Sequence, residues 1–114
     1  MALSRLAQEF AAEINLHDWS DAPYRRDRAG HRRENDSPSK LTDTLSETET
    51  DSVRMNAMWV VAQVLAHRDP NFDVYEFAEA CGVDTRTNTG RRDGGIEAGL
   101  RKRGDHYQQP GMLE

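Results

Sequence analysis

The apolar residues of this chain are concentrated in two blocks, at residues 1–16 and 41–83, whereas residues 17–40 and 84–114 hold few of them. Only the two rich blocks can bury enough apolar surface to offset the conformational entropy that a chain loses when it becomes ordered. The pattern therefore predicts one small all-α domain over residues 1–83, with an irregular basic segment at 17–40, followed by a flexible polar tail over 84–114.

The first block has the periodicity of an amphipathic helix. Its apolar residues recur at steps of three and four positions, which places them on one helix face: Leu3, Leu6, Ala7, Phe10, Ala11 and Ile14. A helix of about 12 residues is only marginally stable alone, so this face needs a partner. The partner is either the rest of the chain or a second copy of it, so the sequence also allows a homo-oligomer.

The second block begins with the pattern of a long helix. Ser46 and Glu49 fit a capping box, in which each side chain bonds the other residue's backbone N–H. The stretch 57–61 is apolar on every side, so we expect it to be the most buried part of the chain. The helix is expected to end near Arg68, because the residue before Pro70 disfavours helical backbone angles.

A third, shorter helix is predicted over residues 74–81. Asp73 is a suitable N-cap, and Phe72 and Phe77 can form a hydrophobic staple across it. Gly82 stands where helices often end in a left-handed conformation. Together with the preceding helix, this element predicts an αα-hairpin.

The two weakly hydrophobic segments show no clear helical pattern. Residues 24–33 hold five arginines and Gly30 with almost no apolar face, so we expect a loop or a frayed helix, followed by a linker at 37–39. The tail carries many glycines and is expected to be mobile. A single turn of helix at 96–100 is expected only on contact with a partner.

Composition and charge limit the function classes. The net charge is −5, from 15 basic and 20 acidic residues, so no overall positive field favours nucleic acid. The one cysteine excludes an internal disulfide and a CxxC metal site. No apolar run approaches the roughly 20 residues that span a bilayer, and the N-terminus does not have the pattern of a signal peptide. We expect a soluble cytoplasmic protein without a membrane partner.

No group of residues predicts catalysis. His17, Asp18 and His31 are metal-ligand types, but their spacing matches no ligand motif, so surface histidines are the better interpretation. Cys81 lies at the end of the third helix, where the helix dipole disfavours a thiolate, and is predicted to be a buried hydrophobic residue. We therefore expect a non-enzymatic protein with no catalytic residue, no cofactor and no metal. A pocket that united His17, Asp21 and His31 around a metal would reopen that question.

The arginine-rich segment holds the candidate partner-binding residues. They combine guanidinium groups with rings that are typical of exposed anchors at interfaces: Trp19, Tyr24, Arg25, Arg26, Arg28, His31, Arg32 and Arg33. Acidic neighbours nearly cancel this charge, so a merely solvated face is one alternative. Docking of the arginines onto the acidic residues of 43–51 is another.

Nucleic-acid binding is the competing interpretation of the same chemistry. It adds the basic residues of the tail, namely Arg91, Arg92, Arg101, Lys102 and Arg103. The hairpin itself does not fit a helix-turn-helix, because its second helix would present Asp73, Glu76 and Glu79 to the phosphates and be repelled.

Two stretches of the chain resemble small accessory proteins of actinobacterial phages and prophages, mycobacteriophages among them. In residues 61–83, an apolar helix leads through the turn DPNFD into the segment FAEACG. The sequences DWSDAPY at 18–24 and DRAGH at 27–31 carry the second likeness. The resemblance implies a phage or prophage gene product that acts in a bacterial cytoplasm, and it brings no activity or catalytic residue with it.

The sequence thus favours a small interaction protein that binds a host or phage protein. The alternative is a nucleic-acid-binding accessory protein that uses residues 25–33 and 91–103.

Overall fold

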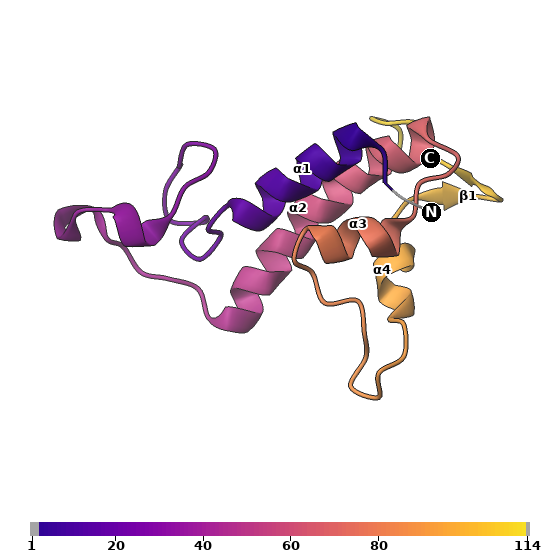
Figure 1. The fold of residues 1–114 in the computed structure, drawn as a ribbon. Coiled ribbons are helices and arrows are strands. Elements are labelled where there is room, and N and C mark those ends of the chain that lie inside the picture. The colour runs from indigo at the N-terminus through magenta and orange to yellow at the C-terminus, as the bar shows by residue number, and fades with distance from the viewer. Residues whose placement is uncertain (1–2, 114) are drawn as a thin grey trace.

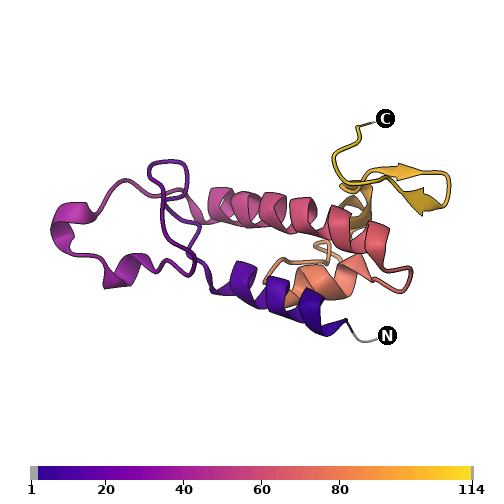
Figure 2. The ribbon, with the colours of Figure 1, turned by 90° about the horizontal axis from the view of Figure 1, so that it is seen from above.

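Three helices pack against one another and form the body of the molecule, as predicted for an all-α fold (Figure 1). They are α1 (Arg5–Leu16), α2 (Glu47–Arg68) and α3 (Val74–Ala80). The structure is a computed structural model, and it describes residues 3–113. Helices α1 and α2 run in opposite directions alongside each other (Figures 1 and 2). The N-terminal apolar face therefore finds its partner within the same chain.

Helix α1 packs through small residues. The Ser4 hydroxyl accepts a hydrogen bond from the backbone N–H of Ala7 (3.1 Å) and so begins the helix. Ala7, Ala11 and Ile14 are its buried residues, whereas Leu6 is 57% exposed. The buried face is therefore narrower than the apolar stripe in the sequence. Close packing follows the row of Ala7, Ala11 and Ile14, and Leu6 lies beside that row.

Helix α2 confirms the predicted capping box and corrects the predicted burial. The Glu49 backbone N–H donates to the Ser46 hydroxyl (3.1 Å), and the Glu49 carboxylate accepts from the Ser46 N–H (2.9 Å). The prediction that 57–61 is the most buried stretch is wrong, since Val60 is 72% exposed. The neighbouring elements cover only one side of α2, so burial follows a single face: Met58, Ala62, Gln63, Leu65 and Ala66.

Helix α3 follows the sequence prediction closely. The Asp73 carboxylate accepts from the Tyr75 N–H (2.9 Å), and the Phe72 and Phe77 rings lie 5.4 Å apart as a staple. Gly82 has a φ of 88°, a left-handed conformation that suits glycine. A side chain here would also meet Asn15 of α1.

The C-terminal segment is folded onto the body, contrary to its prediction as a tail outside the core. It forms α4 (Gly94–Ala98) and a two-stranded antiparallel hairpin, β1 (Lys102–Arg103) and β2 (His106–Tyr107). Ile96 is fully buried and Leu100 is nearly so. Few apolar residues are needed, because polar bonds secure the segment.

Two side chains of α2 make those bonds. The Trp59 indole N–H donates to the carbonyl of Ile96 (2.8 Å). The buried Gln63 amide donates to the carbonyls of Arg101 (3.1 Å) and Gln108 (3.0 Å) and accepts from the Arg101 N–H (2.7 Å). The backbone of the hairpin thus completes its hydrogen bonding on the surface of α2.

Candidate functional site

Residues 17–42, called the basic loop below, project from one end of the helical body (Figures 1 and 2). The loop has two short 3-10 turns, Arg33–Asn35 and Pro38–Lys40. It packs few apolar side chains, so polar contacts must organise it. It joins α1 to α2, and its outer part, which holds the two 3-10 turns, extends beyond the ends of both helices (Figure 1).

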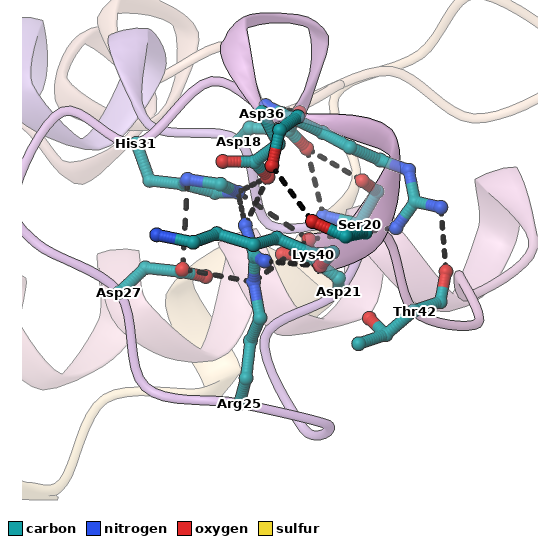
Figure 3. A network of polar contacts seen from close by, with 12 residues as sticks. Asp18, Ser20, Asp21, Arg25, Asp27, His31, Asp36, Lys40 and Thr42 are labelled. Carbon is teal, nitrogen blue, oxygen red and sulfur yellow. Dashed lines mark hydrogen bonds and ion pairs between the residues drawn. The ribbon is translucent and has the colours of Figure 1, made fainter.

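Asp21 lies at the centre of the basic loop and is fully buried. Its Oδ2 lies 3.4 Å from Arg25 Nε, 3.5 Å from Arg33 Nη1 and 3.3 Å from His31 Nε2 (Figure 3). Its Oδ1 has no hydrogen-bond partner among the described residues. A buried carboxylate is strongly unfavourable unless cations compensate it, so the loop folds with the guanidinium groups of Arg25 and Arg33 turned inward.

Arg25 links three carboxylates. Besides Asp21, its guanidinium pairs with Asp27 (Nε to Oδ1, 3.0 Å) and with Asp36. It also donates from Nη1 to the carbonyl of Lys40 (2.6 Å), which ties the outer turn to the centre (Figure 3). Desolvation opposes its charge, but the hydrogen bond to Asp36 and the neighbouring carboxylates outweigh it, so the pKa of Arg25 lies above its ordinary value.

Asp18 closes the loop at its base. Its Oδ1 accepts from the Ser20 N–H (3.0 Å) and hydroxyl (2.6 Å), and its Oδ2 accepts from the Arg33 N–H (3.0 Å). Its own N–H donates to the carbonyl of His31 (2.9 Å). Desolvation raises the pKa of Asp18, but the Ser20 and Arg33 hydrogen bonds and the charge of His31 lower it more, to about 2.

The helices hold the base of the loop in place. The Trp19 indole N–H donates to the carbonyl of Ile14 in α1 (2.9 Å), and the Trp19 ring lies 4.5 Å from that of His17. On the other side, the Leu45 N–H donates to the carbonyl of Ser20 (2.7 Å), immediately before α2. The loop is therefore attached to both α1 and α2.

Several predicted partner-binding residues are not free on the surface. The Arg25, His31 and Arg33 side chains belong to the network around Asp21, which corrects the expectation that they are exposed. Trp19 is half-buried against the helical body. Their carboxylate partners also come from within the loop and not from residues 43–51.

The other predicted residues of the loop do lie on its surface. Tyr24 is 49% exposed, and Arg26 and Arg28 are exposed without an ion pair among the described residues. Arg32 is partly engaged, since it donates to the carbonyl of Leu16 (3.1 Å) and pairs with Glu34 (3.3 Å).

A hollow of about 550 Å³ opens on the outer side of the basic loop. Its walls carry five cationic side chains, His31 and two carboxylates, in a protein whose net charge is −5. We call it the basic hollow. Its charged lining consists of Arg25, Arg26, Arg28, Arg32, Lys40, His31, Asp27 and Asp36. The hollow is thus a locally positive surface on a protein with a negative net charge.

The network also brings together residue types that ligate metals. Asp21, Asp27 and His31 offer ligand atoms that lie within 4.8 Å of one another. Of the set His17, Asp21 and His31 named from the sequence, Asp21 and His31 belong to this group, and Asp27 is its third member. The guanidinium of Arg25 lies 3.0 Å from the Asp27 carboxylate and 3.4 Å from that of Asp21. An arginine already supplies the cation beside these oxygens, so a metal would have to displace it.

The basic residues of the C-terminal segment do not extend this site. The hairpin β1–β2 lies at the opposite end of the molecule from the basic loop, along its 50 Å axis (Figures 1 and 2). Arg92 stacks over the Tyr75 ring at 4.3 Å, and Lys102 pairs with Glu97 at 3.3 Å. The Nε of Arg101 donates to the carbonyl of Met112 (2.9 Å), while Arg91 and Arg103 are exposed.

Other sequence predictions concern the chemistry of the chain. Cys81 is fully buried, and burial raises the pKa of its thiol to about 12, as expected of a hydrophobic residue and not of a nucleophile. Within residues 3–113, no helix is both long and apolar enough to cross a membrane.

Comparison with known proteins adds no relative. No family model, curated protein or solved structure matches the chain.

Proposed function

We propose that this chain is a small non-enzymatic binding protein that recognises a partner protein through the outer face of the basic loop. The observation that carries the proposal is that some of the loop's side chains are engaged inside it while others are exposed. Arg25 and Arg33 stabilise the loop from inside, whereas Tyr24, Arg26 and Arg28 stay on the surface. Tyrosine and arginine are the residue types most often found as interface anchors.

A loop that is already folded binds more tightly than one that must first become ordered. The pairs around Asp21 and the backbone bonds of Asp18 fix the loop before any partner arrives. The entropy lost on binding is then confined to a few exposed side chains, which raises affinity for a given contact area. The positive face favours a partner with an acidic surface, because complementary charge speeds encounter and gives specificity.

The resemblance to actinobacterial phage proteins supports a bacterial cytoplasmic setting, with a host or phage protein as partner. A non-enzymatic role is supported by the state of the reactive groups. The carboxylates of the network pair with guanidinium groups, the His31 imidazole lies against the Asp21 carboxylate, and Cys81 is buried.

Nucleic-acid binding is the weaker candidate, because the two basic segments lie in different regions of the molecule. They do not form one continuous positive surface along which a strand could bind. It predicts a gel shift on random duplex or single-stranded DNA that weakens steeply with salt.

The test is affinity capture from an actinobacterial lysate on the immobilised full chain, with quantitative mass spectrometry. The variant Tyr24→Ala/Arg26→Ala/Arg28→Ala is expected to lose a specific protein. The matched control, Arg91→Ala/Arg103→Ala, removes two exposed cations elsewhere and is expected to retain it. Equal recovery by both variants would contradict the proposal.

A further inference from the structure

We infer that the basic hollow binds a phosphoryl group carried by the partner protein. The inference rests on the proposed function and deepens it by naming the chemical group that is recognised. Its basis is the charge of the residues that line the hollow and which of them already form ion pairs.

Three cations line the hollow without an ion pair among residues 3–113: Arg26, Arg28 and Lys40. A guanidinium offers a planar fork of N–H donors that matches two phosphate oxygens, and an ammonium adds a compact charge. These groups come from two parts of the loop, at 26–28 and at 40. The bond from Arg25 to the Lys40 carbonyl holds those parts together.

The two carboxylates on the wall do not cancel this charge. Asp27 and Asp36 both pair with Arg25, which is itself part of the internal network. With Arg33, this network holds two guanidinium groups against the three carboxylates of Asp21, Asp27 and Asp36, so it keeps one negative charge. The three outer cations carry three positive charges and outweigh it. The hollow offers an incoming anion a net attraction.

Phosphate suits such a site better than a carboxylate does. A phosphorylated side chain carries close to two negative charges and three strong acceptor oxygens, so it can satisfy several of these donors at once. A single carboxylate carries one charge and two oxygens.

A protein-borne phosphate fits the surroundings better than a nucleic-acid strand does. The chain leaves the loop through Asp43 and enters α2 with Glu47 and Glu49 in its first turn, and all three carboxylates are exposed. A strand with a phosphate at every nucleotide would bring further charges against these carboxylates. A lone phosphoserine or phosphothreonine would not.

The test is an ¹H–¹⁵N NMR titration of the full chain at constant ionic strength. The probes are inorganic phosphate, a phosphoserine peptide, the same peptide with serine, and a single-stranded oligonucleotide. We expect saturable shifts at 26–35 with phosphate and with the phosphopeptide. Arg26→Gln/Arg28→Gln should weaken phosphopeptide binding by about tenfold or more, since charge-assisted bonds are lost. Arg91→Gln/Arg103→Gln should leave it unchanged, and circular dichroism checks that both variants fold.

Three outcomes would overturn the inference. One is a linear, unsaturated response to phosphate and phosphopeptide. Another is equal weakening by the two double variants. The third is tighter binding of the oligonucleotide than of the phosphopeptide.

A capture experiment separates this inference from the proposed function. If phosphatase treatment of the lysate leaves partner capture intact and still dependent on Arg26 and Arg28, the phosphoryl inference is wrong and the protein-binding function stands. Loss of capture on phosphatase treatment supports both.

Discussion

The buried carboxylate of Asp21 lies 3.3 Å from the imidazole Nε2 of His31, ten positions further along the chain. This pair joins the start of the basic loop to its returning half, and Arg25 and Arg33 complete the surroundings of the same carboxylate. A segment that packs few apolar side chains thus has a polar centre in place of a hydrophobic one.

Replacing Asp21 by asparagine is expected to loosen the loop. The substitution leaves Arg25 and Arg33 without their shared buried anion, and the free energy of unfolding should fall by about 1–3 kcal/mol. Chemical denaturation measures the loss, and hydrogen exchange at the Asp18 and His31 amides locates it. Asp105→Asn, at an exposed carboxylate, is the control and should change neither. If both variants behave alike, the network does not stabilise the loop.

The lowered pKa of Asp18 predicts that the loop loses stability in acid. Its pKa is lowered from 3.8 to about 2, so its hydrogen bonds contribute stability that is fully present above pH 4 and is lost as the pH falls towards 2. Because the group is partly solvated, the contribution is about 1 kcal/mol. Asp18→Asn should flatten this part of the stability profile, whereas Asp105→Asn should keep the wild-type slope. An unchanged slope in Asp18→Asn would argue against these bonds.

Gln63 is expected to be the main polar attachment of the C-terminal segment. Gln63→Ala removes three hydrogen bonds to the hairpin backbone and leaves the partly buried N–H of Arg101 unpaired, at a cost of about 1–3 kcal/mol. Limited proteolysis should then cut the region around 101–108 faster. Gln109→Ala, at an exposed amide, should be cut at the wild-type rate. Equal rates for the two variants would show that apolar packing alone holds the segment.

Gly99 is expected to tolerate no side chain. A Cβ at this position would lie 2.1 Å from the Trp59 ring, so Gly99→Ala must displace the indole and its bond to Ile96. We expect a loss of about 1–3 kcal/mol and an altered tryptophan fluorescence spectrum. Gly94→Ala is the control, because nothing lies within 4 Å of a Cβ there. A stable Gly99→Ala variant with an unchanged spectrum would contradict the packing of Trp59 on α4.

Local rules predicted the helical hairpin well, because its boundaries depend on nearby residues. The capping box of Ser46 and Glu49, the N-cap at Asp73 and the left-handed Gly82 each act within one helical turn. Their outcome does not depend on how the rest of the chain folds.

The C-terminal segment was predicted poorly because its attachments are long-range and polar. Gln63 reaches backbone groups 38 and 45 positions away, and no apolar pattern signals such bonds. The one indication in the sequence was that Gln63 lies among apolar residues of the same helix, where a polar side chain needs a hydrogen-bond partner.

The basic loop shows the same limit of sequence reasoning. The near cancellation of charge over 17–40 was visible in the sequence, but it did not reveal that Asp21 would be the buried centre. It also could not divide the arginines into inward and outward groups. That division depends on the turn geometry that brings Arg25, His31 and Arg33 to one carboxylate.

The central claim is that the basic loop is folded in the free protein. The most direct measurement is ¹⁵N relaxation of the unbound chain. The account predicts order parameters for residues 18–36 close to those of α1 and α2, about 0.85. Values below about 0.6 across the same residues would show a flexible segment and would contradict it.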